Sequence, residues 1–224
     1  MTVDILSWNI FANITLLEKR TIEIAKKIME EDVDVVCLQE VLYNTFLILN
    51  DVFKERYQSV YSNPYENNTS GRAYGEAIFV KKSRITVTDR FFTPLLSTQG
   101  RTATFVDVVI DDVRKLRIST AHLESATKSH ETTRKIQIEN IKTKLETTSD
   151  WLWIGDSNFE YISPYFIEHT TGPTWFGNRF FNNTMVADYD RVMTNQKIVN
   201  FRQIGNEQVD GMWLSDHNGI ICTV

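Results

Sequence analysis

Carboxylate, amide and imidazole side chains recur directly after short apolar stretches of this 224-residue sequence. In chain order these residues are Asn9, Glu40, His122, Asp156, Asn158, Asp216 and His217. Taken alone, a strand-terminal Asn or Asp is usually a turn former, and a lone Glu usually caps the next helix. Because ligands and catalytic groups of α/β sheets gather at the carboxyl ends of strands, the repeated pattern predicts one shared site.

The types of these side chains indicate which chemistry the site supports. Hard oxygen ligands are offered by Glu40, Asp156, Asp190 and Asp216. Since the sequence has no Cys/His cluster at zinc spacing, Mg²⁺ or Mn²⁺ is favoured over Zn²⁺. Histidines and asparagines can stabilise charge that develops on a phosphoryl oxygen. The sequence contains neither a Gly-rich loop for a nucleotide triphosphate nor a Gly-x-Ser-x-Gly elbow, so metal-assisted hydrolysis of a phosphate ester is the predicted reaction.

The elements that must position these residues begin with an α/β pattern. Residues 3–10 and 33–39 predict two strands, the second apolar and β-branched as in a sheet covered on both faces. Residues 15–31 and 41–56 predict helices, the first with Ile24 and Ile28 on one face. This strand–helix–strand–helix order is typical of α/β proteins.

The rest of the chain is richer in strands. Strands are predicted over 74–82, 84–92, 101–110, 115–121, 151–155, 186–194, 197–204 and 218–224, a helix over 131–146, and loops over 63–72, 160–172 and 177–184. Asp111-Asp112 predicts a tight turn between two of the strands. Helix-linked and hairpin-linked strands together indicate two mixed sheets packed face to face, with the helices outside.

The charge balance and the absence of a linker restrict the kind of nucleic-acid contact and the number of domains that we expect. The balance of 24 Lys+Arg against 29 Asp+Glu excludes a protein that coats duplex nucleic acid through many phosphate contacts. Any such contact should be local, and the candidate clusters are Lys81, Lys82 and Arg84, and Lys128, Arg134 and Lys135, each also typical of a solvated face. No linker-like stretch divides the motifs, which predicts a single domain over residues 1–224.

Two cysteines and the N-terminal sequence indicate where the protein resides. Cys37 and Cys222 each lie in an apolar run, which predicts buried free thiols and a reducing compartment. The sequence shows no charged-then-apolar leader and no apolar run of membrane-spanning length. We therefore expect an intracellular protein of the nucleus or cytoplasm that is not secreted.

The motifs, taken in order, resemble those of the endonuclease/exonuclease/phosphatase superfamily. They are Trp8-Asn9, Leu38-Gln39-Glu40, His122-Leu123-Glu124, Gly155-Asp156-Ser157-Asn158, Tyr189-Asp190-Arg191-Val192 and Ser215-Asp216-His217. Each motif is short, but the ordered set is specific and spans nearly the whole chain. The resemblance implies a DNase I-like, four-layer α/β/β/α sandwich of two mixed sheets, with a divalent metal cofactor.

One branch of the superfamily fits further motifs. His122–Ser125, Ser97–Arg101, Thr174-Trp175 and Tyr189–Val192 resemble 5′-tyrosyl-DNA phosphodiesterases of the tyrosyl-DNA phosphodiesterase 2 type. Those enzymes remove the tyrosine left on a DNA 5′ end by a trapped type II topoisomerase, and some release tyrosine-linked proteins from viral RNA. The resemblance implies a Mg²⁺ cofactor (with Mn²⁺ as an alternative), 5′-tyrosyl DNA or RNA ends as the substrate, no membrane partner, and a monomer.

The resemblance also implies roles for the polar residues near the metal. Glu40 is expected to bind Mg²⁺ directly, with Asn9 and Asp216 nearby and acting through water. Asp156 is expected to orient or deprotonate the attacking water, and Asn158 to position it.

Two histidines are expected to bind the phosphate. By the same resemblance, His217 and His122 contact the non-bridging oxygens, and Asp190 holds His217 in the right tautomer. Asp188 is the rival to Asp190, because both would lie on the same face of one predicted strand. The expected substrate contacts are Arg101, Ser125 and Trp175, for which a surface ion pair, a helix cap and a core position are the respective alternatives.

The sequence departs from that branch at two places. Phe159-Glu160 follows the Gly-Asp-x-Asn motif where leucine and then arginine are expected, which removes a cation from beside the phosphates. The loop around Phe180 and Phe181 is also unfamiliar, and these rings either stack on a single-stranded base or belong to the core.

Other functions remain open on the sequence alone. An abasic-site endonuclease or exonuclease shares the outer motifs, and a phosphoinositide phosphatase or sphingomyelinase shares the fold, although no hydrophobic membrane hairpin is present. A binding module that has lost catalysis would have lost one of Glu40, Asp156 or His217, all of which are retained. Fold alone does not decide among these substrates.

Overall fold

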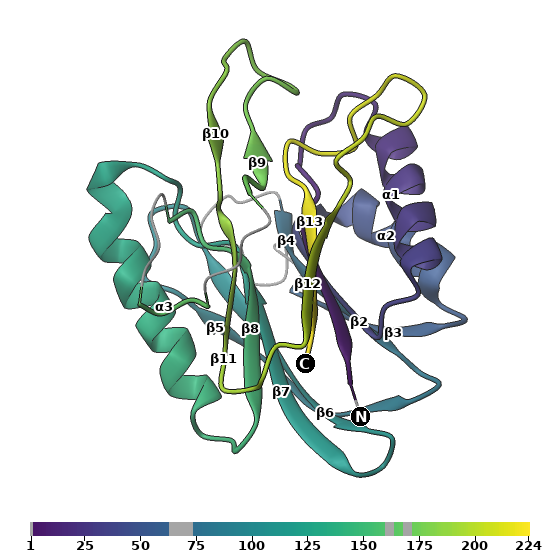
Figure 1. Cartoon of the computed structure of the whole chain (residues 1–224), viewed down its shortest axis with the longest axis vertical. Helices are drawn as coiled ribbons and strands as arrows, with labels where there is room; N and C mark the ends of the chain where they lie inside the picture. The colour runs from purple at the N-terminus through teal and green to yellow at the C-terminus, as the bar shows by residue number, and fades with distance from the viewer. Residues whose placement is uncertain (1, 63–73, 160–163, 168–171) are drawn as a thin grey trace.

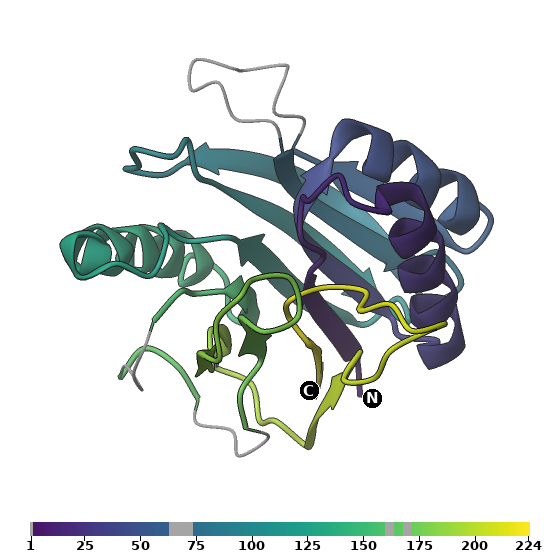
Figure 2. The same ribbon diagram turned by 90° about the horizontal axis from the view of Figure 1, so that it is seen from above.

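Two β-sheets pack face to face at the centre of the molecule, and helices cover their outer faces (Figure 1). The computed structural model describes residues 2–62, 74–159, 164–167 and 172–224. Seen from above, two helices lie beside one sheet and the third long helix lies beside the other (Figure 2). The arrangement is the four-layer α/β/β/α sandwich that the sequence predicts.

The first sheet is six-stranded and carries both ends of the chain. In spatial order its strands are β12 (Asn200–Ile204), β13 (Gly219–Thr223), β1 (Asp4–Asn9), β2 (Val35–Leu42), β4 (Tyr74–Lys81) and β3 (Tyr57–Tyr61). The β1–β2 pair is parallel and all the other pairs are antiparallel. Because β1 and β2 are parallel, the residues that end them lie at the same edge of the sheet.

The second sheet is five-stranded and is built around a parallel β7–β8 pair. In spatial order its strands are β11 (Asp190–Thr194), β8 (Trp151–Asp156), β7 (Arg114–Ala121), β6 (Thr102–Ile110) and β5 (Ile85–Pro94). The β6–β7 hairpin turns through Asp111 and Asp112, whose φ angles of 48° and 59° are left-handed. Asp tolerates this conformation in tight hairpin turns, so the predicted turn is confirmed.

Three apolar layers hold the four structural layers together. Side chains such as Ile5, Ile78, Val106 and Ile118 fill the space between the sheets. The helices α1 (Leu17–Glu31) and α2 (Tyr43–Phe53) bury one apolar face each against the first sheet. The helix α3 (Glu131–Leu145), preceded by a 3-10 turn over Lys128–His130, packs Ile138, Ile141 and Leu145 on the second sheet. Each layer removes one apolar stripe from water, which is the main favourable term in folding.

Three details of the strand prediction were wrong: β3 and the two-residue β9 (Trp175–Phe176) were not predicted, and one predicted strand is broken in two. The strand β3 was not predicted, because its exposed and buried positions do not alternate cleanly. The strand predicted over 186–194 is broken at residues 188–189 into β10 (Val186–Ala187), which pairs with β9 (Trp175–Phe176), and β11. The break arises because the Thr174 hydroxyl oxygen accepts hydrogen bonds from the N–H groups of Tyr189 and Asp190, both at 3.1 Å. The predicted loop over 63–72 and most of that over 160–172 lie outside the described residues.

The first basic cluster does not form an exposed patch beside the predicted site. Lys81 binds the carbonyl and carboxylate oxygens of Asp32, and Arg84 pairs with Asp34 and Asp111. Since Val35 pairs with Val80, Lys81 lies at the opposite end of β2 from Glu40.

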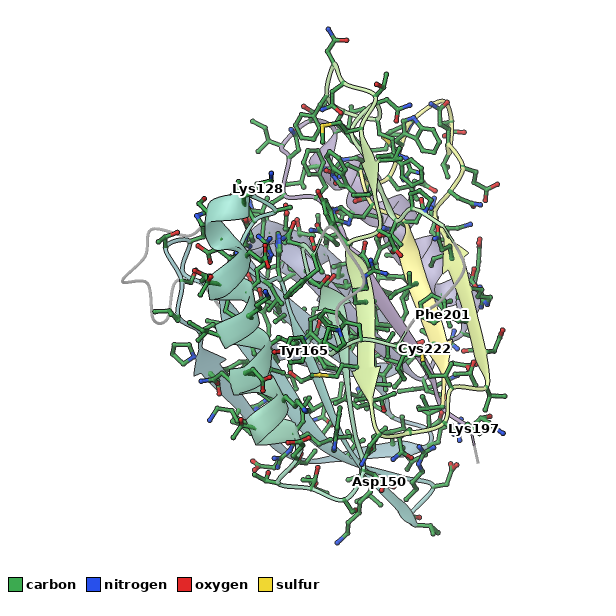
Figure 3. All side chains as sticks on the ribbon, turned by 60° about the vertical axis from the view of Figure 1, so that its left-hand side comes forward. Lys128, Asp150, Tyr165, Lys197, Phe201 and Cys222 are labelled. Atoms are coloured by element: carbon green, nitrogen blue, oxygen red, sulfur yellow. The ribbon has the colours of Figure 1, made fainter. Side chains whose placement is uncertain are left out.

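The second cluster is divided between the surface and the interior. Lys128 lies just before α3, near the end of this helix that is far from Asp150 (Figure 3). Arg134 is buried and donates to the carbonyl oxygens of Ser125 and Thr127, and Lys135 pairs with Glu131. Arg134 therefore stabilises a loop of this protein.

The cysteines and helices agree with the sequence analysis. Cys37 and Cys222 are free and buried, and burial raises the pKa of both thiols, which keeps them protonated and unreactive. Among the described residues, no helix has both the length and the apolar composition needed to cross a membrane.

Candidate active site

A pocket of about 370 Å³ opens where the ends of strands from both sheets meet. It is lined by Phe11, Glu40, Tyr74, Gln99, Arg101, His122, Ser125, Ala126, Asp156, Asn158, Trp175, Phe181, Tyr189, Asp216 and His217. Asn9 and Asp190 contact lining residues from just behind its wall. The structure thus brings together every residue that the sequence analysis assigned to catalysis, metal binding or substrate binding.

A bulge in β2 aims Glu40 into the pocket. The register of β2 against β4 shifts between Leu38 and Val41, so that two residues of β2 face one residue of β4. Glu40 has a left-handed backbone with φ of 58°, a conformation that costs a non-glycine residue about 1–3 kcal/mol. Its two carboxylate oxygens accept hydrogen bonds from Asn9 Nδ2 at 3.2 Å and from the N–H of Ala12 at 2.8 Å. Bulges commonly re-aim a side chain beside an active site, and this one fixes the carboxylate.

Asn9 joins the two halves of the site. Its Nδ2 donates to Glu40 of the first sheet and, at 2.9 Å, to Asp156 of the second. The carbonyl oxygen of Asn9 accepts a hydrogen bond from the Ser215 hydroxyl at 2.6 Å, which ties the end of β1 to the segment before β13. Asn9 therefore holds two carboxylates, one from each sheet, at a fixed spacing.

Asp156 lies at the centre of the polar cluster and is buried. Its Oδ1 accepts a hydrogen bond from the N–H of Asn158 at 3.0 Å, while Oδ2 lies 3.3 Å from His122 Nε2 and 3.6 Å from His217 Nε2. Burial raises the pKa of Asp156; His217 and Asn9 oppose the rise, and the carboxylates of Asp190 and Glu40 add to it. A carboxylate with a raised pKa is a better base, which suits general base catalysis near neutral pH.

His217 is held by a carboxylate on the side facing away from the pocket. Its Nδ1 lies 2.8 Å from Asp190 Oδ2, and its backbone carbonyl oxygen accepts a hydrogen bond from Trp8 Nε1 at 3.0 Å. Burial alone would lower the pKa of His217, but the carboxylates of Asp190 and Asp156 outweigh it and raise that pKa. The raised pKa favours the protonated imidazole, whose Nε2 lies beside Asp156.

Asp188 is separated from this pair by the break between β10 and β11. Its Oδ2 binds Arg191 Nη1 at 2.5 Å. The expectation that Asp188 and Asp190 share one strand face is therefore wrong, because Asp190 begins β11 whereas Asp188 precedes it. Burial raises the pKa of Asp188 to about 6, with Arg191 opposing the rise.

The side chains of Asp216 and Trp175 are joined by a hydrogen bond. Trp175 Nε1 donates to Asp216 Oδ2 at 3.0 Å, and the indole is half-buried in the pocket wall, so the core position weighed for Trp175 is not observed. Burial raises the pKa of Asp216. The charge of His217 opposes this rise, and the carboxylate of Glu40 adds to it.

Arg101 faces the pocket as a buried cation. The residue is 3% exposed, and its guanidinium donates to the hydroxyl of Tyr74 at 3.4 Å and to Gln99 Oε1 at 2.9 Å. Within the part of the chain that the structure describes, no carboxylate forms an ion pair with Arg101. The alternative of a surface ion pair is therefore wrong, and the positive charge remains available to an anion in the pocket.

Ser125 and Arg101 both form hydrogen bonds with the side chain of Gln99. The Ser125 hydroxyl oxygen accepts a hydrogen bond from Gln99 Nε2 at 3.0 Å, and the N–H of Ser125 donates to Gln99 Oε1. His130 Nδ1 lies 3.3 Å from the same hydroxyl. Ser125 therefore belongs to the polar wall of the pocket, and its contacts are not those of a helix cap.

Glu124 explains why the segment bearing Gln99 and Arg101 has a fixed shape. Its fully buried carboxylate accepts hydrogen bonds from the hydroxyls of Ser97 and Thr98, from the N–H of Thr98 and from Gln137 Nε2. Burial alone would raise the pKa of Glu124, but these donors outweigh it and lower the pKa below its ordinary value.

We expect Glu124→Gln to destabilise the fold by about 1–3 kcal/mol at pH 7, because the amide cannot accept from all the donors that surround it. A carboxyl with a lowered folded pKa contributes stability above its unfolded pKa of about 4.3 and loses it as the pH falls through the folded value. Urea unfolding should therefore show a gap between wild type and Glu124→Gln that is largest at pH 7 and shrinks below about pH 4. Glu146→Gln, on the surface of the same layer, should show no such gap; an equal gap for both variants would contradict the assignment.

The two departures from the expected motifs have clear positions. Phe159 is fully buried against Phe166, with Arg134 over its ring at 5.5 Å, so that position belongs to the core. Glu160 lies outside the described residues.

The rings of Phe180 and Phe181 lie at the mouth of the pocket and not in the core. Their centroids are 4.8 Å and 5.7 Å from that of Phe11, and Phe181 is 45% exposed. Of the two alternatives weighed for these residues, the core position is therefore wrong.

The donors in the pocket fit a hard divalent ion. In the described part of the chain, no three His, Cys, Asp or Glu side chains form a preassembled cage. Mg²⁺ is usually held by one or two carboxylates and keeps several waters, so a cage is not required. The bulged Glu40 lines the pocket together with Asp216, and Asn9 is hydrogen-bonded to the Glu40 carboxylate.

Several lining residues were not assigned to the site from sequence. Phe11 follows Asn9 by two positions, and its φ of 57° is rare for a bulky residue. Tyr189 lies in the motif that supplies Asp190, and Gln99 lies between Ser97 and Arg101, so proximity to a motif was an available signal. Tyr74, whose ring lies 6.3 Å from that of His122, carried no local signal.

Comparison with known proteins agrees with this arrangement. Residues 6–217 match the sequence profile of the Endonuclease/Exonuclease/phosphatase family. None of the curated proteins matches the chain.

Solved structures with the same fold include TDP2 from D. rerio in complex with single strand DNA product, which is 20% identical with a TM-score of 0.86 over 99% of this chain and 98% of that one. A humanized D. rerio TDP2 gives 21% identity and a TM-score of 0.85 over the same shares. A truncated C. elegans TDP2 gives 22% and 0.83 over 100% and 97%. At these identities the likeness establishes the fold.

Proposed function

This chain belongs to the endonuclease/exonuclease/phosphatase family, and from that premise we propose that it is a Mg²⁺-dependent phosphodiesterase that hydrolyses the 5′-phosphotyrosyl bond between a nucleic acid end and a protein tyrosine. Family membership makes a hydrolase of phosphate esters the expected class of activity, and enzymes of this family generally depend on a divalent metal. The nature of the ester and of the ion is our proposal.

The observation that carries the proposal is the single pocket in which a carboxylate pair, two imidazoles and one buried guanidinium converge. Glu40 and Asp156 are bridged by Asn9, and His122 lies within 3.6 Å of both carboxylates. Arg101 stands on the polar wall of the same pocket. Oxygen ligands beside cationic donors suit a phosphate diester, whose charge is negative.

A divalent ion held by Glu40, with Asn9 and Asp216 acting through water, would neutralise charge on the phosphate and on the leaving oxygen. Mg²⁺ is favoured because the donors are oxygen atoms and the site offers no thiolate. Mn²⁺ prefers similar ligands and is expected to substitute for it.

Asp156 is the residue proposed to activate water. Its Oδ1 accepts one hydrogen bond, from the N–H of Asn158, whereas Oδ2 accepts from Asn9 Nδ2 and lies beside both imidazoles, so Oδ1 is the oxygen with the freer lone pair for the proton. Asn158 has a left-handed backbone with φ of 51°, and its Nδ2 donates to the carbonyl oxygen of Leu123, which fixes the amide beside Asp156. The amide oxygen of Asn158 is then available to orient the water.

The histidines are proposed to hold the phosphate. The protonated Nε2 of His217 and the ring of His122 would donate to non-bridging oxygens as negative charge grows on them. Asp190 keeps the Nδ1 proton of His217 directed away from the substrate. Water adds to phosphorus and the bond to the tyrosine oxygen breaks, which yields a 5′-phosphate and a free tyrosine. A phenol with a pKa of about 10 leaves more readily than an alkoxide.

Recognition of the nucleic acid is proposed to use the outer wall of the pocket. Arg101 and Ser125 would contact the phosphate or the adduct, and the half-buried Trp175 and the exposed Phe181 offer faces on which a base can stack. Stacking favours a single-stranded end, and the D. rerio TDP2 structure holds a single strand DNA product.

The remaining proposals concern the domain organisation, compartment, oligomeric state and partner of the protein. We propose that residues 1–224 act as one catalytic domain, because each sheet contributes a carboxylate and a histidine to the pocket. We further propose an intracellular monomer whose partner is a 5′ end of DNA, with RNA as a second substrate and no membrane surface.

The proposal is tested with a 5′-tyrosyl oligonucleotide. We expect release of the 5′-phosphate oligonucleotide in Mg²⁺ or Mn²⁺ and loss of that release in EDTA, measured on denaturing gels. A 3′-tyrosyl oligonucleotide is the matched control and should remain intact. Cleavage of an abasic duplex without action on the 5′-tyrosyl end would instead establish a repair endonuclease. Action only on a phosphoinositide or on sphingomyelin vesicles would establish a lipid phosphodiesterase.

A further inference from the structure

The loop between β9 and β10, residues 177–185, carries Arg179 and the two aromatic rings at the pocket mouth. It starts directly after Phe176 and closes on itself, because the N–H of Gly177 donates to the carbonyl oxygen of Met185 at 2.9 Å. A Cβ at Gly177 would meet the side chain of Asn183, which would have to move to make room for it. The loop is therefore a compact structural unit beside the active site.

Arg179 is clamped between two aromatic side chains. Its guanidinium carbon lies 4.2 Å from the ring centre of Phe176 and 4.2 Å from that of Trp213. Phe176 belongs to β9, whereas Trp213 belongs to the segment that leads to Asp216. Cation–π contacts on both faces attach the loop to that segment, and the planar guanidinium is the group best suited to such a position.

The same guanidinium forms hydrogen bonds on both sides of the Asp216-His217 pair in the sequence. Its Nη1 donates to the carbonyl oxygen of Ser215 at 3.3 Å, and its Nη2 donates to Asn218 Oδ1 at 2.7 Å. These acceptors lie immediately before and after Asp216-His217. The backbone adds a further link, since the N–H of Phe176 donates to the carbonyl oxygen of Asp216 at 2.9 Å.

The ring that follows Arg179 is held on the opposite side of the pocket mouth. Phe180 packs on Phe11, and the buried Arg20 lies 5.5 Å from its ring centre. Arg20 is itself fixed by the carbonyl oxygens of Ile10, Phe11, Asn13, Thr15 and Leu214. With Arg179 and Phe180 both anchored, Phe181 is left exposed and lines the pocket.

We propose that Arg179 is a positioning residue for oligonucleotide substrates: it locks loop 177–185 onto the Asp216-His217 segment, so that Phe181 stands beside the active site as a platform for a nucleobase. The inference rests on the proposed function, because it assigns the platform to the nucleic acid strand that carries the scissile ester. Arg179 makes its contacts with the protein and acts through Phe181, so its loss should weaken binding of the strand more than it slows the chemistry.

The test compares Arg179→Met, Phe181→Ala and the double variant on two substrates. One is a 5′-tyrosyl oligonucleotide of ten nucleotides, and the other is bis(p-nitrophenyl) phosphate, a short phosphodiester that carries no nucleobase. We expect Arg179→Met to raise KM for the oligonucleotide about tenfold, as loss of one stacked base would, and to change kcat by less than about threefold. On the short ester both constants should change by less than about threefold. Arg202→Met is the matched control, because Arg202 pairs with Glu31 away from the pocket and should leave both substrates unaffected.

A double-mutant cycle separates positioning from general damage to the fold. If Arg179 acts through Phe181, the double variant should lose no more affinity than Phe181→Ala alone, and Phe181→Trp should retain wild-type affinity. Affinity is also measured directly, by fluorescence anisotropy of a labelled single-stranded oligonucleotide without a tyrosyl group.

Each outcome decides a separate question. Equal losses on both substrates, additive losses in the cycle, or unchanged affinity for the strand would overturn the role of Arg179. If wild type cleaves no 5′-tyrosyl substrate, the proposed function fails, while the anisotropy comparison still confirms or overturns the platform.

Discussion

Asp156→Asn is expected to lower kcat for the 5′-tyrosyl substrate by on the order of 10²–10⁴, the span usual for removal of an acid–base group. The amide has nearly the shape of the carboxylate, so it can still accept from the N–H of Asn158, but it cannot take a proton from water. The substitution also removes one of the negative charges that surround His217. Stopped-time assays with saturating Mg²⁺ should show the loss in kcat, with KM changed much less.

The fold should survive this change. Asp156 is buried among His122, His217 and Asn9, and the neutral amide removes a carboxylate that burial disfavours. Urea unfolding should therefore place the midpoint of Asp156→Asn at or above that of wild type. Asp150→Asn, in the loop that leads into the same strand, is the control and should keep full activity. A well-folded Asp156→Asn enzyme with wild-type kcat would show that another group activates the water.

Much of the fold was predictable because apolar patterning is a local property of the chain. The parallel β1–β2 pair follows from two apolar strands separated by a helix with Ile24 and Ile28 on one face, and the Asp111-Asp112 hairpin follows from turn chemistry. The strand β3 was missed because its five residues do not alternate cleanly between buried and exposed positions, and its buried Tyr57 joins the cluster that α2 packs on.

The polar cluster was predictable for a related reason. Asn9, Asp156 and His217 each lie at the end of an apolar strand or just before one, and strand ends in the same sheet edge lie close together. Sequence order alone could not show that Asn9 bridges carboxylates of two different sheets, because the packing of one sheet on another is set by side chains throughout the core.

The parts that could not be predicted depend on contacts between distant segments. The bulge that turns Glu40 toward the pocket is stabilised by the pairing of β2 with β4 and by the N–H of Ala12. The role of Arg179 depends on its contact with Trp213, which is distant in the sequence. The place of Tyr74 in the pocket depends likewise on the packing of β4 beside His122. Single-sequence reasoning can identify such residues as polar or aromatic, but their partners are far away in the chain.

Asp190→Asn is expected to lower kcat by on the order of 10²–10⁴, which approaches the loss from the corresponding change of a serine protease triad, about 10⁴. The Asp190 carboxylate accepts the proton of His217 Nδ1, so it fixes the ring and stabilises its charge. An amide can present its NH₂ group to Nδ1, which forces that nitrogen to act as an acceptor and favours the wrong tautomer. The chemical shifts of His217 Nδ1 and Nε2 in ¹⁵N NMR spectra should report this change directly.

Asp188→Asn supplies a matched control two residues away in the same loop region. Asp188 bonds to Arg191, and an amide oxygen at this position can still accept that bond. Among the described residues its carboxylate forms no hydrogen bond or ion pair with His217, so kcat should stay within about threefold of wild type, the margin expected for a change that removes no transition-state contact. Because both substitutions remove one negative charge near the site, buried for Asp190 and half-buried for Asp188, a general electrostatic effect would lower both rates. Equal losses for Asp188→Asn and Asp190→Asn would therefore refute the specific pairing of Asp190 with His217, whereas a loss confined to Asp190→Asn requires the hydrogen bond itself.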